Sequence, residues 1–142
     1  MLTLQSLLED KGRSVLSVSP DAPVLDAVRI MAQSHVGALL VMTGEQLIGI
    51  ISERDYARKV VLLGRSSSDT PVRDIMTSPV LTVQPGDTIH AAMQIMTEHR
   101  VRHLPVVVDG AVLGVVSIGD LVKCVIEEQR HHIEYLETYI RG

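Results

Sequence analysis

The sequence predicts an α+β protein in which one β-α-β-β-α unit occurs twice, the two copies being related by pseudo-twofold symmetry. The chain overlays on itself without a gap at an offset of 65 residues, and the matches include Pro20 with Pro85 and Met31 with Met96. Both copies end in Gly, two β-branched residues, Ser, two variable residues and Asp, as "GIISERD" from Gly49 and "GVVSIGD" from Gly114. A period this long indicates a duplicated supersecondary unit and not a solenoid repeat.

The elements of the first copy follow from its periodicity. A short N-terminal helix precedes it, and "SVLSVSPDAPVLDAVRIMAQSHV" predicts a short strand, a proline-marked turn and a helix. The segment "GALLVMTGEQLIGIIS" predicts a hairpin that turns at Thr43-Gly44-Glu45 and whose second strand ends at Ser52. The segment "ERDYARKVVLLG" predicts a helix that ends at Gly64, and His35 is expected to cap the preceding helix.

The second copy repeats this order, with a hairpin turn at Asp109-Gly110 and a longer final helix. Between the copies, "RSSSDTP" is predicted to be a polar linker and "VRDIM" a short helix. We expect four segments: 1–64 with the first repeat, 65–79 as linker and short helix, 80–126 as the second repeat, and 127–142 as a helical extension.

Composition excludes several classes of protein. The 142 residues contain no Phe or Trp and only three Tyr, so the core is expected to consist of Val, Ile, Leu and Met. A net charge of −4 argues against nucleic-acid binding, and no apolar stretch is long enough to indicate a membrane span. The single Cys124 excludes a disulfide framework within the chain, is expected to be a buried inert thiol, and favours a cytoplasmic protein.

The Ser-x-x-Asp ends allow two interpretations. In the first, Ser52 with Asp55, and Ser117 with Asp120, form capping boxes at strand-to-helix junctions. In the second, the same groups bind a nucleotide, because a carboxylate can accept both hydrogens of a ribose diol and a helix N-terminus attracts phosphate. Capping and binding are compatible before a ligand arrives. The occurrence of the motif at equivalent ends of both copies favours binding.

These residues carry a resemblance to a known family. The duplicated unit ending in G-h-h-S-x-x-D, where h is a hydrophobic residue, together with "DIMTSPVLTV", "EHRVRHLPVV" and "GVVSIGDLV", resembles a pair of CBS domains, the arrangement called a Bateman module. The resemblance covers roughly residues 5 to 126 and is strongest to small stand-alone bacterial members. It implies that AMP, ADP, ATP, NAD or S-adenosylmethionine binds in clefts between the repeats, and that occupancy is signalled to a regulated partner.

The resemblance also implies where the adenine lies. The flat base needs an apolar slot edged by backbone amides. The implied slots join the start of a first strand to the start of a second strand: Leu16 with Val36, Gly37 and Ala38, and Thr77 and Leu81 with Val101, Arg102 and His103. Which carboxylate serves which slot is left open by the sequence.

Basic residues near these positions are candidates for phosphate binding. Arg54 lies inside the first Ser-x-x-Asp motif, whereas Arg58 and Lys59 are expected on a solvated helix face. The cluster His99, Arg100, Arg102 and His103 is suited to phosphate. His131 and His132 point about 100° apart on a helix and make a poor chelate.

No catalytic set or metal-ligand spacing emerges, so we expect a binding protein and no catalytic cofactor or metal. Two alternatives stay open: a structural interaction protein without a ligand, and a sensor of S-adenosylmethionine. A nucleotide hydrolase is a weaker alternative.

Self-association is also expected. The run from Val60 to Leu63 is too apolar for one helix face to hide, and the resemblance implies flat dimers formed through such helices. In the final helix, residues up to Ile126 are expected in the core. Beyond them Ile133, Leu136 and Ile140 form a narrow apolar stripe that we expect to pack against a second subunit.

Overall fold

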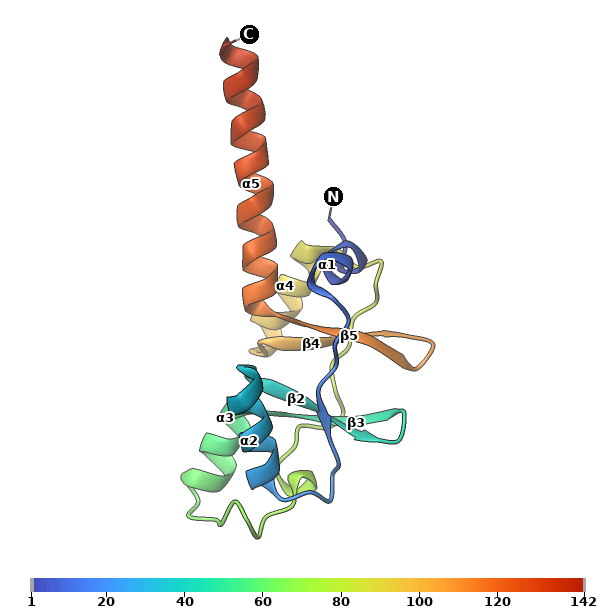
Figure 1. The fold of residues 1–142 in the computed structure, drawn as a ribbon, viewed down its shortest axis with the longest axis vertical. Helices are drawn as coiled ribbons and strands as arrows, with labels where there is room; N and C mark the ends of the chain where they lie inside the picture. Colours follow the sequence, from blue (N-terminus) through green and yellow to red (C-terminus); the bar gives the residue numbers. More distant parts are fainter. Residues whose placement is uncertain (1, 142) are drawn as a thin grey trace. The chain divides into compact units, whose positions relative to one another are not determined.

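The computed structural model describes residues 2–141, which form two compact units (Figure 1). Within the described residues, the N-terminal unit consists of residues 14–81 and 109–112, and the C-terminal unit of residues 2–13, 82–108 and 113–141. Each unit has its own hydrophobic core, and each contains one copy of the repeat. The duplicated α+β architecture predicted from the sequence is therefore confirmed.

The N-terminal unit contains a three-stranded sheet. The strand β1 (Ser17–Val18) pairs in parallel with β2 (Ala38–Thr43), which pairs antiparallel with β3 (Gln46–Ser52). The helix α2 (Val24–Ser34) buries Val24, Ala27 and Met31 in the core, as its periodicity predicts. The short helix α3 (Glu53–Tyr56), the π-helix η1 (Ala57–Val61) and the 3₁₀ turn η2 (Val72–Asp74) complete the unit.

The C-terminal unit repeats this plan, but its sheet has two strands where the first has three. The strands β4 (His103–Val108) and β5 (Ala111–Ser117) form a two-stranded sheet, and α4 (Ile89–His99) and α5 (Ile118–Arg141) follow the predicted order. The expected first strand is only a single bridge between Val83 and Val106. This bridge still inserts the 2%-exposed Val83 into the core, which is the packing role that the strand would have.

The two copies agree even in how their helices end. His35 at the end of α2 and Arg100 at the end of α4 have left-handed backbones, with φ of 55° and 54°. In each case the following valine amide donates to a methionine carbonyl in the helix, Val36 to Met31 and Val101 to Met96, both at 3.1 Å. The predicted capping role of His35 is confirmed, and Arg100 has the same role in the second copy.

The helix predicted from residue 53 to Gly64 is not a continuous α-helix. It changes to π geometry at Ala57–Val61, where the amide of Leu62 donates to the carbonyl of Ala57, five residues earlier. The extra residue per turn rotates the end of the helix. Val60 is consequently buried at 2% exposure, while Leu62 and Leu63 are 76% and 67% exposed.

The N-terminal helix packs in the core of the second copy, although sequence order groups it with the first. The helix α1 (Leu4–Lys11) buries Leu4, Leu7 and Leu8 among Ile89, Leu104, Val116 and other residues of the C-terminal unit. The amides of Leu4 and Gln5 donate to the carbonyls of Asp87 and Pro85. Apolar burial on one face of α1 therefore joins the first residues of the chain to its second half.

The predicted polar linker is an ordered part of the N-terminal unit. The carbonyl of Thr70 accepts from the amide of Val24 at 2.8 Å, and the carbonyl of Ser67 accepts from Leu25 at 3.0 Å. These bonds satisfy the first amides of α2, whose N-cap Pro23 has no side-chain cap. Thr70 is itself 3% exposed and donates its hydroxyl to the carbonyl of Ser66.

No helix within residues 2–141 is long and apolar enough to cross a membrane.

Candidate functional site

The first Ser-x-x-Asp motif forms a complete capping box at the junction of β3 and α3. The backbone amide of Asp55 donates to the Ser52 hydroxyl oxygen at 3.2 Å, and the amide of Ser52 donates to Asp55 Oδ2 at 3.0 Å. The Ser52 hydroxyl also donates to the same carboxylate oxygen at 3.1 Å. The capping interpretation is thus confirmed, and it holds the Asp55 side chain in one orientation.

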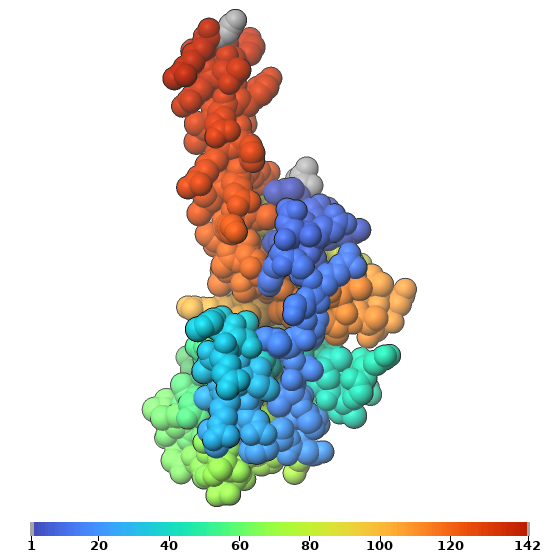
Figure 2. Space-filling view, viewed as in Figure 1, coloured from blue at the N-terminus to red at the C-terminus, as the bar shows by residue number. Residues whose placement is uncertain are grey.

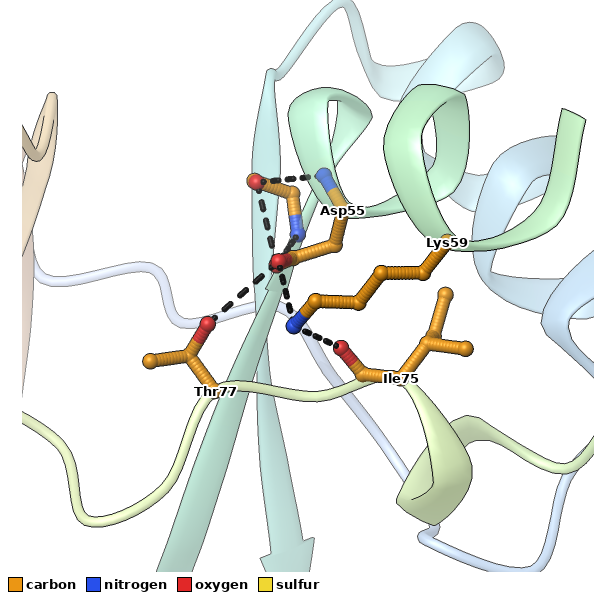
Figure 3. A network of polar contacts seen from close by, with 5 residues as sticks. Asp55, Lys59, Ile75 and Thr77 are labelled. Carbon is orange, nitrogen blue, oxygen red and sulfur yellow. Dashed lines mark hydrogen bonds and ion pairs between the residues drawn. The ribbon is translucent and has the colours of Figure 1, made fainter. Parts of the chain in front are cut away.

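The other oxygen of Asp55 meets a lysine and a threonine (Figure 3). Lys59 Nζ lies 3.1 Å from Asp55 Oδ1 and donates to the carbonyl of Ile75 at 2.9 Å. The Thr77 hydroxyl donates to Asp55 Oδ1 at 3.3 Å. A carboxylate has about four lone-pair sites. In this structure Asp55 accepts four contacts from three neighbouring side chains and one amide.

The second motif repeats the box at the junction of β5 and α5. The amide of Asp120 donates to the Ser117 hydroxyl oxygen at 3.1 Å, and the amide of Ser117 donates to Asp120 Oδ2 at 2.9 Å. Here the lysine comes from the N-terminal helix: Lys11 Nζ lies 2.6 Å from Asp120 Oδ2 and donates to the carbonyl of Val115 at 2.7 Å. The two contacts made to the Asp120 carboxylate, from the Ser117 amide and from Lys11, both use Oδ2.

The electrostatics of Asp120 favour its ionised form. Partial burial acts to raise the pKa of this carboxyl. The hydrogen bond and charge of Lys11, with the amide and hydroxyl of Ser117, outweigh burial and hold the pKa below its ordinary value. Asp120 is therefore a carboxylate at neutral pH, as an acceptor of hydroxyl hydrogens must be.

The start of the second strand in each copy lies directly beside the capping box of the same copy. The carbonyl of Gly37 accepts from the amide of Glu53 at 3.0 Å, and Ala38 is the register partner of Ser52. In the second copy the carbonyl of Arg102 accepts from the amide of Ile118 at 2.9 Å. Each unit thus brings together a predicted base-contacting segment and a predicted ribose-binding carboxylate.

The remaining predicted residues divide between the units. The N-terminal unit holds Leu16, Val36, Arg54, Thr77 and Leu81, and the C-terminal unit holds Val101 and His103. Leu16 and Leu81 are 36% and 40% exposed, so part of each side chain is accessible. Thr77, which sequence reasoning grouped with residues 101–103, contacts Asp55 of the first copy.

Some of the backbone amides predicted to bind phosphate at the N-termini of α3 and α5 already form hydrogen bonds within the protein. The amides of Glu53 and Asp55 already donate to Gly37 and Ser52, and those of Ile118 and Asp120 to Arg102 and Ser117. Fewer amides than a bare helix N-terminus offers are therefore available to a phosphate.

Sequence reasoning missed two lysines. Lys59 was expected on a solvated face, but its side chain is only 42% exposed and bonds Asp55. The spacing of four residues from Asp55 was a signal for this ion pair. Lys11 lies 109 residues from Asp120, and no local pattern could connect them.

Cys124 and the potential metal ligands in the described part of the chain do not form a further site. Cys124 is partly and not fully buried; burial, followed by the nearby carboxylates of Glu127, Asp10 and Glu128, raises the pKa of its thiol. Among residues 2–141, no group of three or more His, Cys, Asp or Glu side chains could hold a metal ion.

Comparison with known proteins places these features in a class. Two copies of one α+β unit, each ending in a capped Ser-x-x-Asp, define a tandem-repeat protein. The model of the CBS domain family matches residues 12–62 and 72–127, and the chain belongs to this family.

Similar proteins cover most of the chain. The mitochondrial CBS domain-containing protein CBSX3 of Arabidopsis thaliana is 46% identical over 99% of this chain and 72% of its own length. A signal-transduction protein with CBS domains from Burkholderia ambifaria is 48% identical, with a TM-score of 0.87 over 90% of this chain and 96% of its own. The CBS domain protein PAE2072 of Pyrobaculum aerophilum, solved in complex with AMP, is 29% identical with a TM-score of 0.74, over 84% of this chain and 89% of its own.

Proposed function

We propose that the protein is a non-catalytic regulatory module that binds an adenine nucleotide and signals its occupancy to a partner. The observation that carries this proposal is the preorganised carboxylate at the same point of both copies, Asp55 and Asp120. Each is oriented by the amide of its own serine. An oriented, ionised carboxylate is the acceptor that a ribose diol requires. The complex of PAE2072 with AMP supports this ligand class.

The neighbouring groups support the rest of the ligand. In this proposal Gly37 and Ala38, with the accessible side chain of Leu16 in the same unit, edge one adenine, and the equivalent residues 102–103 of the C-terminal unit edge the other. Lys59 and Lys11 neutralise the carboxylates before a ligand arrives. Because a diol competes for the same lone pairs, binding at Asp55 requires the 3.3 Å contact from Thr77 to lengthen.

The proposal includes pairing of two copies and a location in the cell. Val61, Leu62 and Leu63 are 56%, 76% and 67% exposed beside one another, which supports pairing of two copies into a homodimer. We propose a cytoplasmic location on the single cysteine, although the Arabidopsis relative is described as mitochondrial.

Calorimetric titration with AMP, ATP, NAD and S-adenosylmethionine tests the ligand class. We expect AMP or another adenine nucleotide to bind. Asp55→Asn and Asp120→Asn keep an acceptor for the serine amide but remove the charge, so each should weaken its site about 10- to 100-fold, because a hydrogen bond to a charged group contributes about 1.5–3 kcal/mol. Asp109→Asn, in an exposed turn with φ of 48°, is the matched control and should bind as the parent does.

Three outcomes would count against the proposal. Unchanged affinity in both site variants would exclude the ribose role of these carboxylates. If the parent bound none of the four ligands, and denaturation released no adenosyl compound detectable by mass spectrometry, the alternative of a structural interaction protein would hold. Conversion of the nucleotide during incubation would indicate an enzyme.

A further inference from the structure

The second half of α5 stands apart from the rest of its own unit (Figures 1 and 2). The helix has 24 residues, and its early residue Leu121 is fully buried in the core. From residue 126 to residue 141 every position is exposed. This half of the helix therefore gains nothing from burial within its unit, and a helix this exposed depends on another partner for stability.

An apolar stripe runs along this helix and begins earlier than the sequence suggested. Val122 and Ile126 were expected in the core, but they are 40% and 44% exposed. They are exposed because Leu121 and Val125, on the adjacent face, make the core contacts. The stripe continues through Ile133, Leu136 and Ile140, which are 54%, 43% and 82% exposed.

The spacing of the stripe is that of a heptad repeat. Ile126, Ile133 and Ile140 recur every seven residues, and the second heptad position is occupied at the same interval by Val122, Gln129 and Leu136. At about 100° per residue these six positions fall within a narrow arc of the helix surface. Isoleucine at all three first positions, with Leu136 at one of the second positions, favours a two-stranded coiled coil.

The polar residues make a second copy the best occupant of the stripe. One flank of the stripe carries both signs of charge, with Lys123 and Arg130 followed by Glu137. A membrane-surface helix would instead have a predominantly basic polar face. A seven-residue apolar period of this kind is self-complementary, because each side chain fits between those of an identical helix.

Gln129 decides whether the two helices of the pair run parallel or antiparallel. In an antiparallel pair Gln129 would face Ile133 of the other copy in two layers, and the two Arg130 side chains would lie near each other. In a parallel pair the two Gln129 amides share one layer and hydrogen-bond to each other, while His132 of one copy flanks Glu137 of the other. Because one polar layer with a matched partner costs less than two unmatched ones, the parallel arrangement is favoured.

We propose that residues 122–140 of α5 in two copies of this chain form a parallel two-stranded coiled coil. This interface does not depend on nucleotide binding. It uses different residues from any pairing through Leu62 and Leu63.

Sedimentation equilibrium of the full chain tests whether the apolar stripe of α5 mediates self-association. Ile133→Glu places a charge in the stripe and should weaken self-association at least about tenfold, with AMP titration unchanged. His131→Glu introduces the same charge on the outer face, where it is the matched control and should leave association as in the parent. A monomeric parent, or an Ile133→Glu variant that associates as strongly as the parent, would overturn the proposal.

Disulfide trapping in a Cys124→Ser background tests the direction. Leu136→Cys alone should form a covalent dimer under mild oxidation, and Glu134→Cys on the outer face should not. An antiparallel pair would instead link Ile126→Cys to Leu136→Cys in a mixture, with little link between two copies of Leu136→Cys. That result would exclude the parallel arrangement whether or not the protein binds nucleotide.

Discussion

Asp55 and Asp120 occupy equivalent positions, yet each obtains its lysine from a different part of the chain. Asp55 pairs with Lys59, four residues later on the same helical segment. At the offset of 65 residues the position equivalent to Lys59 is Cys124, which cannot neutralise a carboxylate. Lys11 of α1 supplies the missing charge to Asp120. The duplicated sites therefore keep the same chemistry with different donors.

The Asp120 pair predicts a pH-dependent contribution to stability. Because the folded-state pKa of Asp120 lies below its ordinary value, the stabilisation is fully present above about pH 3.9, the unfolded value, and is lost as the pH falls through the lower folded value. Lys11→Met should lower the free energy of unfolding at pH 7 by about 0.2–1 kcal/mol, since the pair is partly exposed.

Urea unfolding of the parent and of Lys11→Met, measured from pH 7 to below pH 3, checks this sign. The difference between the two proteins should shrink on acidification. Arg13→Met removes an exposed cation nearby and serves as the control. A difference that grew as the pH fell would contradict the assigned pair.

At the scale of elements, the glycine that opens each G-h-h-S-x-x-D motif lets a preceding segment reach the strand. A Cβ at Gly114 would lie 2.8 Å from Leu8 Cδ2 of α1, and a Cβ at Gly49 would lie 2.5 Å from Met76 Sδ, after η2. The same strand position is thus covered by α1 in one unit and by the η2 segment in the other. The motif glycine is required by packing, separately from any ligand.

Gly114→Ala should consequently destabilise the C-terminal unit by about 1–3 kcal/mol through overpacking against Leu8. Gly119→Ala is a matched control, because its Cβ would meet only the Ser117 hydroxyl oxygen, at 3.6 Å. Thermal or urea unfolding measures both. In a Leu8→Ala background the cost of Gly114→Ala should fall, and equal costs in the two backgrounds would show that the strain lies elsewhere.

At the scale of the whole molecule, the order of the chain and the membership of the cores differ. The first eleven residues contribute Leu4, Leu7 and Leu8 to a core formed otherwise by residues after 82, while the segment between the repeats completes the first core. Neither unit is therefore a contiguous piece of sequence, and cutting the chain between the repeats would leave the second copy without α1.

Deletion of residues 2–11 should selectively loosen the C-terminal unit. Burial of one leucine contributes about 1.5–3 kcal/mol, and three are removed together with Lys11. Hydrogen exchange should show faster amide exchange over residues 82–126 and little change over the core of residues 17–76. Truncation after Glu127 is the comparison, since residues 128–141 are exposed. Uniform loosening of both units would contradict the independence of the two cores.

The sequence by itself determined the duplication, the order of the helices and strands, the family resemblance and the paired capping boxes. These features depend on residues close together in the chain: apolar periodicity defines α2 and α4, and a hydroxyl and a carboxylate three residues apart define each box. The 65-residue offset carried one copy onto the other. The assignments of the nucleotide-contacting residues rest on the resemblance and stay predictions.

Only the tertiary structure decided which distant residues complete each site. Lys11 reaches Asp120, Thr77 reaches Asp55, and α1 joins the second core, each through contacts between segments far apart in sequence. The exposure of Val122 and Ile126 was likewise hidden, because an apolar period shows that a face is apolar but not what covers it. Local patterns encode local geometry, whereas these contacts depend on how separate segments pack.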